Sequence, residues 1–319
     1  MNIFSVQNLK TYFFTSEGTA KAVDGISFDI AEGEILCLVG ESGCGKSVTS
    51  LSMLNLVPKP GKIVGGELLF RNRDILRLSE KEIRKIRGKE ISLIFQEPMT
   101  SLNPVFTVGN QVAEVFKIHA GLSSGEARKA GIDMFRKVKI PDPDMRFNDY
   151  PHQLSGGMQQ RVMIAMALAC KPALLIADEP TTALDVTIQS QILELLCSLR
   201  DEFSMSILFI THDLGIVSEI GDRVIVMYSG KIVETGLKDE IIHKPKHPYT
   251  AGLLASIPEL GTSAEKLNVI PGQVPSPLKE IDGCRFNPRC PRAVERCFKE
   301  EPELLGAEDK RKIACFNMF

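Results

Sequence analysis

Short apolar runs separated by turns open the chain and predict strands. Ile3–Val6, Ala22–Val23 and Ile26–Ile30 are runs of this kind. The turn at Gly33 is followed by the uninterrupted run EILCLVG, which is typical of a buried strand. We therefore expect a small β layer that leads into a central strand.

Helical patterns begin after that strand. A Gly-rich loop precedes a helical stretch, Val48–Val57, which the sequence Pro58-Lys59-Pro60-Gly61 ends. A charged, helix-like segment, Ser79–Lys89, lies within a stretch of otherwise strand-like character at 66–94.

The middle of the chain is mostly helical at first and then returns to strands. Residues 105–170 have helical character, with a break around 141–143, and they are followed by the strand-like run ALLIAD. A helix is expected at Val186–Phe203, and then the strands SILFIT and RVIVMYSG. Strands that alternate with helices around a Gly-rich loop predict an α/β fold with a mainly parallel sheet.

The character of the chain changes after residue 244, because proline becomes frequent. The prolines of this tail are those at 245, 248, 258, 271, 275, 277, 288, 291 and 302. Proline cannot donate to a sheet ladder, so we expect an irregular appendage rather than a continuation of the sheet.

Composition and charge narrow the possible roles. The 319 residues include 38 basic and 40 acidic side chains, a net charge of −2, which gives no overall attraction to nucleic acid. The N-terminus has no basic head followed by an apolar core, so a secretory signal is not expected. No run approaches the roughly 20 apolar residues of a spanning helix. Any role at a membrane is therefore expected to be peripheral.

The Gly-rich loop carries the first chemical motif. GESGCGKS fits the phosphate-loop pattern G-x-x-x-x-G-K-[ST], and it lies between a predicted strand and a predicted helix, as that motif requires. Backbone N–H groups of such a loop cradle phosphates, and the helix dipole adds attraction. Lys46 would reach the β and γ phosphates, and Ser47 would bind Mg²⁺. The residues predicted to contact nucleotide here are Gly40, Glu41, Ser42, Gly43, Cys44, Gly45, Lys46, Ser47 and Val48.

A second motif ends the strand ALLIAD. Asp178 would stand at the carboxyl end of a buried strand and hold Mg²⁺ through water. Glu179 follows directly and would polarise the attacking water as general base.

The third motif, LSGGMQQRV, spans Leu154–Val162 and indicates a second anion-binding helix start. One compact subunit cannot use two phosphate cradles on one nucleotide. A head-to-tail dimer resolves this, if Ser155, Gly156 and Gly157 act on the nucleotide held by the loop of a partner.

With these three motifs in this order, residues 1–258 resemble the ABC ATPase family, whose hallmark is the LSGGxQ signature. The resemblance implies a nucleotide-binding domain over 1–258, with an antiparallel β layer, a helical subdomain at about 97–170, and an extension at 259–319. It also implies the Q-loop glutamine at Gln96, a contact to Mg²⁺ and the attacking water. The remaining roles that it implies are a D-loop at Ala183-Leu184-Asp185, a switch histidine at His212 and an adenine-stacking aromatic at Phe13 with Tyr12 beside it.

Further sequence fragments resemble one branch of that family, the dipeptide and oligopeptide importer ATPases. They are QEPMTSLNP (96–104), HPYTAGLL (247–254), PGQVPSP (271–277) and GCRFNPRCP (283–291). The branch implies a second ATPase subunit, two membrane permease subunits and an extracytoplasmic binding protein, at the cytoplasmic face of the membrane. Nickel importers share much of this pattern and stay an alternative. A soluble ABC protein of translation or DNA repair is disfavoured, because the chain has one phosphate loop, one signature and no long heptad run.

Four cysteines crowd the extension with the spacing C-x₅-C-x₆-C-x₁₇-C. They are Cys284, Cys290, Cys297 and Cys315. Structural zinc usually uses close C-x₂₋₄-C pairs, whereas a [4Fe–4S] cluster takes four thiolates at wider spacings. We therefore predict an iron–sulfur cluster that staples the extension, in a structural or redox-responsive role. Zinc, free thiols and a disulfide are the alternatives.

Overall fold

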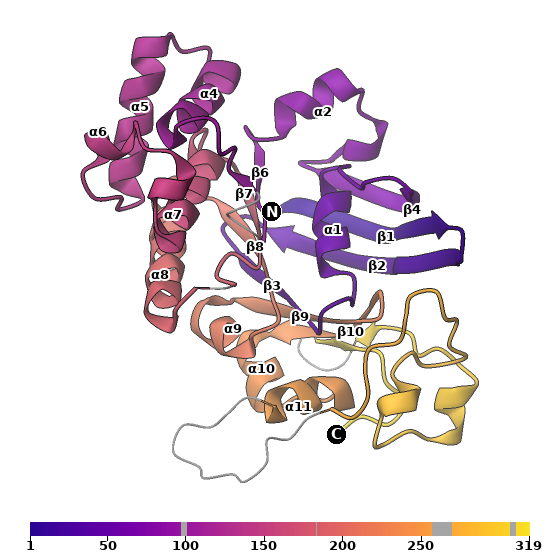
Figure 1. Ribbon diagram of the computed structural model, residues 1–319. Helices are drawn as coiled ribbons and strands as arrows, with labels where there is room; N and C mark the ends of the chain where they lie inside the picture. Colours follow the sequence, from indigo (N-terminus) through magenta and orange to yellow (C-terminus); the bar gives the residue numbers. More distant parts are fainter. Residues whose placement is uncertain (97–100, 183, 257–269, 307–310) are drawn as a thin grey trace. The chain divides into compact units, whose positions relative to one another are not determined.

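A computed structural model describes residues 1–96, 101–182, 184–256, 270–306 and 311–319 (Figure 1). Contacts between Cα atoms divide the chain into two compact units. The helical unit consists of Met1, Ala31–Gly33 and Arg77–Leu208. The phosphate-loop unit consists of Asn2–Ile30, Glu34–Leu76 and Phe209–Phe319.

The phosphate-loop unit contains the predicted β layer. Its four strands are ordered β2-β1-β4-β5, and β1 pairs with β4 in antiparallel register through partners such as Val6 and Leu68. The alternation of buried and exposed residues along β1 reflects one covered face, as expected for such a layer. These strands are β1 (Asn2–Thr15), β2 (Gly18–Ala31), β4 (Gly61–Phe70) and β5 (Arg73–Asp74).

The apolar run after Gly33 forms β3 (Ile35–Val39), and all of its residues are buried, as predicted. β3 pairs in parallel with β9 (Arg223–Tyr228), and β9 pairs in antiparallel fashion with β10 (Lys231–Leu237). A strand that is buried on both faces needs an uninterrupted apolar sequence, which explains the pattern.

The helices of the phosphate-loop unit are short. The helical stretch predicted at Val48–Val57 is observed as α1 (Lys46–Met53), which begins directly after the Gly-rich loop. The others are α9 (Leu214–Ile220), α10 (Lys238–His243) and α11 (Pro248–Ala255), with the 3₁₀ helices η1 (Ile75–Arg77), η3 (Asn287–Arg289) and η4 (Glu295–Phe298).

The C-terminal tail is not wholly irregular, which corrects our expectation. β12 (Lys312–Ile313) pairs with β10 through Ile313 and Glu234, and β11 (Leu305–Gly306) pairs with β12. The tail therefore continues the sheet. Each added strand has two residues, which is too short to show any alternation of apolar and polar positions.

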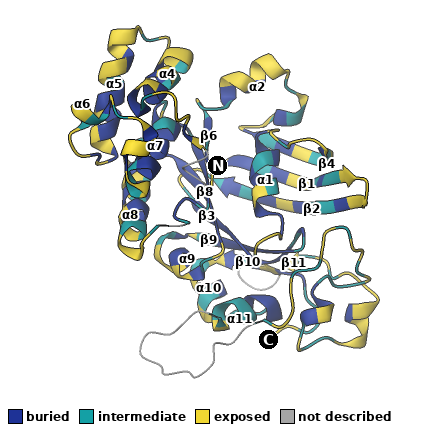
Figure 2. Ribbon diagram, viewed as in Figure 1, coloured by how far each residue is buried: buried dark blue, intermediate teal, exposed yellow. Residues whose placement is uncertain are grey.

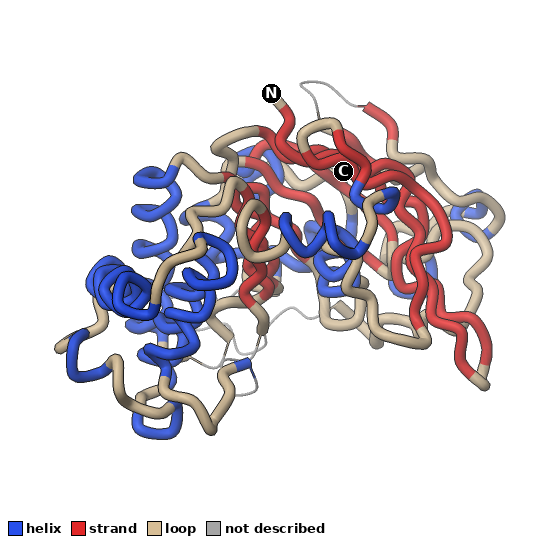
Figure 3. Tube along the Cα trace, turned by 90° about the horizontal axis from the view of Figure 1, so that it is seen from above, coloured by secondary structure: helices blue, strands red, loops and turns tan. Residues whose placement is uncertain are grey.

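In the helical unit, β6 (Ile91–Ile94) pairs in parallel with β7 (Leu174–Asp178). Most of its remaining regular structure is helical, drawn in blue in Figure 3. β8 (Ser206–Thr211) begins in this unit and ends in the other. The helices are α2 (Glu80–Ile86), α4 (Val108–Ala120), α5 (Ser124–Lys137), α6 (Pro143–Arg146), η2 (Pro151–Gln153), α7 (Gly156–Leu168) and α8 (Val186–Phe203).

Phe147 anchors the small helices of this unit. Its ring lies 5.8 Å from that of Phe135, and added Cβ atoms at Gly109 and Gly131 would lie 2.2 and 2.8 Å from it. The glycines thus let α4 and α5 approach the ring closely. Away from the ring, the outer face of α5 is exposed, as Figure 2 shows.

Two sequence predictions, a helix and a helix break, can be compared with the helical unit. The helix expected at Val186–Phe203 is observed with those bounds, and the break around 141–143 separates α5 from α6. The division at 258/259 and the start of the helical subdomain at 97 lie outside the described residues, so the domain boundaries stay predictions. Among the described helices, none is long and apolar enough to cross a membrane.

Candidate functional site

The Gly-rich loop has the strand–loop–helix context that its motif requires, between β3 and α1. A Cβ atom at Gly40 would lie 2.2 Å from the carbonyl oxygen of Met227, and one at Gly45 would lie 2.3 Å from that of Ala22. No side chain fits at either position. At Gly43 a Cβ would meet nothing within 4 Å, so the middle of the loop has an open side.

Lys46 supplies positive charge to this loop. Its Nζ atom donates hydrogen bonds of 2.8 and 3.1 Å to the carbonyl oxygens of Gly40 and Glu41. Ser47 is exposed in the first turn of α1. An open, glycine-lined loop with a lysine folded across it is suited to bind phosphate groups.

Glu41 of the loop is held by two residues that our sequence analysis did not select. The hydroxyl of Tyr249 accepts a 2.9 Å hydrogen bond from the Glu41 backbone N–H. The Arg289 guanidinium donates bonds of 2.7 and 3.0 Å to the two carboxylate oxygens of Glu41. Both residues belong to fragments that we used only to recognise a branch of the family.

The helical unit brings Gln96 and Glu179 together. Asp178 is the buried last residue of β7, and Glu179 follows it with a φ of 48°. Gln96 Nε2 and Thr182 Oγ1 donate hydrogen bonds of 3.1 and 3.0 Å to Oε2 of Glu179. A left-handed backbone at a non-glycine residue costs free energy, and such residues cluster at functional sites.

The signature motif opens a helix, as predicted. α7 begins at Gly156, and the side chain of Ser155 accepts a 3.4 Å hydrogen bond from the backbone N–H of Met158. A Cβ at Gly156 would meet only Leu184, at 4.0 Å, whereas one at Gly157 would lie 2.9 Å from Ile188. The surface at Gly156 is therefore open.

Asp185 and His212, two further predicted site residues, lie at exposed positions. Asp185 is the exposed N-cap of α8, and Ala183 of the predicted D-loop lies outside the described residues. His212 follows β8 and is exposed, next to Asp213, which caps α9 by accepting a hydrogen bond from Gly215.

Tyr12 and Phe13 point to opposite faces of β1, since side chains alternate along a strand. Thr11, two residues before Phe13, contacts Ser52 of α1 at 2.8 Å, so Phe13 shares the face that meets α1. The Tyr12 hydroxyl donates a 2.5 Å hydrogen bond to Asp24. Burial, with this bond, raises the pKa of Tyr12 to about 12. Phe13, and not Tyr12, therefore lies on the face of β1 that contacts α1, the helix that follows the phosphate loop.

The predicted iron–sulfur cluster is wrong, and so is its zinc alternative. Within the described ranges, which include all four cysteines of the extension, no three His, Cys, Asp or Glu side chains are grouped so that they could hold a metal ion. Burial raises the pKa of Cys284 to about 11, and it also raises the pKa of Cys290 and that of Cys315. All four cysteines are free, and burial favours the neutral thiol at these three, whereas a metal binds the thiolate. Buried arginine pairs hold the extension instead.

Three comparisons place the chain among known proteins. Residues 23–182 match the family model described as ABC transporter, and residues 233–297 match that described as oligopeptide/dipeptide transporter, C-terminal region. The oligopeptide transport ATP-binding protein AppD of Bacillus subtilis is 52% identical over 98% of this chain and 96% of its own length. The dipeptide transport ATP-binding protein DppD of Escherichia coli is 50% identical over 99% of this chain and 96% of its own length.

Solved structures agree with this placement. The dimeric post-hydrolysis structure of the ATP-binding cassette MJ0796 with ADP and Pi is 30% identical, with a TM-score of 0.66, over 74% of this chain and 98% of that one. The structure of cbiO1 from Clostridium perfringens is 31% identical, with a TM-score of 0.65, over 76% of this chain and 91% of that one.

The fold, the phosphate loop with Lys46 and the Gln96–Glu179 pair define an ATP-hydrolysing subunit with an ABC ATPase fold. The chain belongs to the ABC transporter family, in its oligopeptide and dipeptide transporter branch.

Proposed function

We propose that the chain hydrolyses ATP to drive the uptake of dipeptides or oligopeptides across the cytoplasmic membrane. The observation that carries this proposal is the 52% identity to an oligopeptide transport ATP-binding protein along 98% of the chain. The match of residues 233–297 to the oligopeptide/dipeptide transporter region favours peptide over nickel as the solute.

The phosphate loop is proposed to bind the phosphates of ATP, and Phe13 to stack on its adenine, with Tyr12 beside it. The open side of the loop and the Lys46 ammonium support the first role. The face that Phe13 shares with Thr11 supports the second. The proposed ATP contacts in this chain are Tyr12, Phe13, Gly40, Glu41, Ser42, Gly43, Cys44, Gly45, Lys46, Ser47 and Val48.

Glu179 is proposed to act as general base, Gln96 to orient it and the attacking water, and His212 to contact the γ-phosphate. The hydrogen bond between Gln96 and Glu179 supports the first two roles. Ser47, Gln96 and Asp178 would hold Mg²⁺, because hydroxyl, amide and carboxylate oxygens are the ligands that it prefers. When bound, Mg²⁺ neutralises charge that develops on the phosphates.

Ser155, Gly156, Gly157 and Asp185 are proposed to act on a nucleotide bound by a second ATPase subunit, either a copy of this chain or a relative. The open surface at Gly156 supports this role, since among the described residues a Cβ atom there would meet only Leu184, at 4.0 Å. Two permease subunits and an extracytoplasmic binding protein would complete the importer. The chain would then lie peripherally at the cytoplasmic face of the membrane.

Solute uptake in cells tests the proposal. Cells that lack the gene for this chain, complemented with wild type or with the Glu179→Gln variant, would be given labelled dipeptide, labelled oligopeptide or radioactive nickel. We expect wild type, but not Glu179→Gln, to restore peptide uptake. Neither protein should change nickel uptake. Restored nickel uptake with unchanged peptide uptake would contradict the proposal and select the alternative solute.

A further inference from the structure

One residue of the phosphate loop, Glu41, is held at both its backbone and its side chain by groups that follow residue 244. Tyr249 accepts from its backbone N–H at 2.9 Å, and Arg289 grips its carboxylate through two nitrogens at 2.7 and 3.0 Å. A paired, two-point contact between guanidinium and carboxylate fixes orientation as well as distance. All three residues belong to the phosphate-loop unit.

Arg289 cannot turn away from this contact without losing other bonds. Its side chain is only 4% exposed, and Nε donates a 2.8 Å hydrogen bond to the carbonyl oxygen of Pro271. A further donor lies 3.3 Å from the carbonyl oxygen of Gly272. The guanidinium carbon stands 5.8 Å from the centre of the Tyr228 ring. These contacts therefore hold the Arg289 guanidinium in one position, unlike that of a mobile surface arginine.

Tyr249 is equally constrained. It is fully buried, and its ring centre lies 4.7 Å from that of Tyr228 and 5.3 Å from that of Phe286. Tyr228 ends β9, whereas Phe286 belongs to the extension. The hydroxyl that holds Glu41 is thus carried by an aromatic cluster to which both the sheet and the extension contribute.

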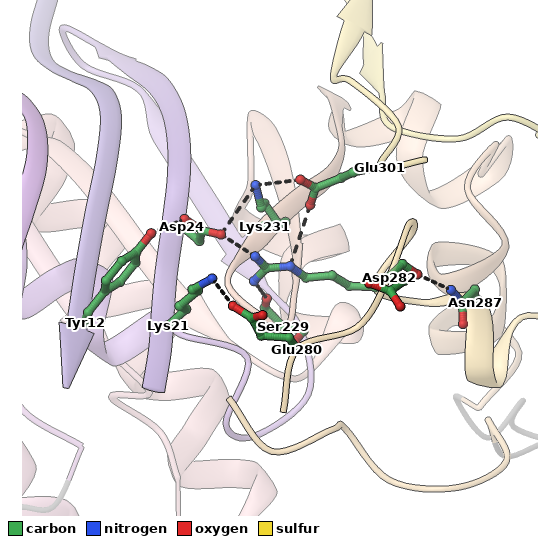
Figure 4. A network of polar contacts seen from close by, with 10 residues as sticks. Tyr12, Lys21, Asp24, Ser229, Lys231, Glu280, Asp282, Asn287 and Glu301 are labelled. Carbon is green, nitrogen blue, oxygen red and sulfur yellow. Dashed lines mark hydrogen bonds and ion pairs between the residues drawn. The ribbon is translucent and has the colours of Figure 1, made fainter. Parts of the chain in front are cut away.

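A second arginine of the extension, Arg285, is linked to the loop indirectly, through Ser229 and Gly230. Arg285 donates a 2.6 Å hydrogen bond to the carbonyl oxygen of Ser229 and forms an ion pair with Asp24. The next residue, Gly230, donates from its N–H to the carbonyl oxygen of Cys44 in the loop at 2.9 Å. Figure 4 shows Lys231 between Asp24 and Glu301, with which it pairs at 3.7 and 3.1 Å.

We infer that Arg289 is a positioning residue of the ATPase: through Glu41 it holds the phosphate loop in its nucleotide-binding conformation, and so makes ATP affinity depend on the folded extension. The inference rests on the proposed role of the loop in binding phosphate. Since binding energies are linked reciprocally, ATP must in turn stabilise the extension around Arg289.

Nucleotide affinity of the full-length chain tests this inference. Arg289→Gln removes the charge and the paired contact, and we expect it to raise the Kd for a fluorescent ATP analogue by on the order of tenfold, a usual size for such coupling. Arg289→Lys keeps the positive charge but cannot contact both carboxylate oxygens through two nitrogens, and is expected to recover part of the affinity. KM should rise more than kcat falls, because the residue acts on the loop and not on the reacting atoms.

Arg296→Gln is the matched control. Arg296 lies in the same extension, but its side chain is 59% exposed, and it contacts Glu300 at 2.9 Å and the ring of Phe316 at 4.1 Å. We expect wild-type affinity from this variant.

Lys46→Ala separates failure of the inference from failure of the proposed function. If Lys46→Ala binds ATP like wild type, the assignment of the phosphate loop is wrong. If Lys46→Ala loses binding while Arg289→Gln and Arg296→Gln bind alike, only the inference about Arg289 is overturned.

Hydrogen exchange of the wild-type chain keeps the inference testable should the Arg289 variants fail to fold. ATP is expected to slow amide exchange at residues 284–292, and Lys46→Ala should abolish that effect. Unchanged exchange in the presence of saturating ATP would overturn the inference without any change at Arg289.

Discussion

Oε2 of Glu179 accepts a hydrogen bond of 3.1 Å from the side-chain amide of Gln96. Thr182 donates to the same oxygen at 3.0 Å, so the carboxylate is held in one orientation by two neutral donors. Such support is expected for a general base, whose lone pair must be aimed at a water molecule.

Replacing Glu179 by Gln should therefore abolish turnover without loss of binding. Gln can keep an oxygen toward both donors, but it lacks the basic oxygen, and we expect ATP hydrolysis to fall by roughly 10²–10⁴-fold. Phosphate release measures the loss, and binding of a fluorescent ATP analogue is the control. Turnover at the wild-type rate would remove Glu179 from the role of base.

The backbone of Glu179 makes a separate prediction about stability. Its φ of 48° strains any residue with a Cβ atom, whereas glycine adopts that conformation freely. Glu179→Gly should therefore be more stable than Glu179→Ala by about 0.5–1 kcal/mol, after the greater freedom of the unfolded glycine chain is subtracted. Urea midpoints compare the two variants, and both should be inactive. Equal midpoints, or the reverse order, would show that the strain is absent.

Shared sites can be detected by mixing two inactive subunits. Lys46→Ala damages the phosphate loop, and Gly156→Asp places a negative charge where a Cβ meets only Leu184 at 4.0 Å. Because that space is open, the second variant should fold normally. Mixed dimers contain one intact composite site and should regain ATPase activity that neither variant has alone. Unlinked variants that exchange subunits but stay inactive would argue against action in trans.

His247 predicts a dependence of stability on pH. Burial lowers the pKa of this side chain from 6.5 to about 4, against a smaller opposing effect of a hydrogen bond to the Ala314 backbone. The unfolded chain therefore binds more protons between these values. Stability is fully present above pH 6.5, falls as the pH drops towards 4, and this group contributes about 3 kcal/mol of that fall.

The variant His247→Asn isolates this contribution. Asn can still cap α11, where the His247 imidazole now accepts from the backbone N–H of Tyr249 at 3.0 Å, but it does not titrate. The difference in unfolding free energy between wild type and variant should shrink as the pH falls from 7 to 4.5. A difference that is constant with pH would mean that the histidine is not buried in its neutral form.

A buried ion pair between Arg311 of the extension and Glu234 of β10 makes the last prediction. Arg311 and Glu234 are 5% and 0% exposed, and Glu234 also accepts from the backbone N–H of Lys246 at 2.9 Å. Arg311→Met leaves a buried carboxylate without its partner, and should cost about 3–5 kcal/mol. Adding Glu234→Gln removes the charge and should restore part of the loss. Thermal melting of the single and double variants measures both effects, and a stable single variant would contradict the burial of the pair.

Much of the fold follows from patterns that are local in sequence. The apolar runs at β3, β7 and β8 predict buried strands because each strand is covered on both faces. The helix Val186–Phe203 is observed with its predicted bounds. The strand–loop–helix arrangement around Lys46 follows from the apolar run before the loop, the phosphate-loop pattern and the helical stretch after it.

Contacts between distant positions could not be predicted in this way. Glu41 and Arg289 are separated by 248 positions, and nothing near either residue identifies the other. The cysteines of the extension show the converse error. Their spacing suggested a common metal, but a spacing does not say whether each sulfur is buried as a protonated thiol, which depends on the packing around it.

The two residues of β12 have an importance out of proportion to their number, because they lie along β10. A strand with an unpaired side is a template for strands of other molecules, and proteins avoid aggregation by covering such edges. A chain cut before residue 305 would lose both β11 and β12 and present Thr235 and its neighbours on β10 to other copies. Versions of this subunit cut before residue 305 are therefore expected to self-associate during purification, whatever becomes of their catalysis, because β11 and β12 shield this edge of β10 from other molecules.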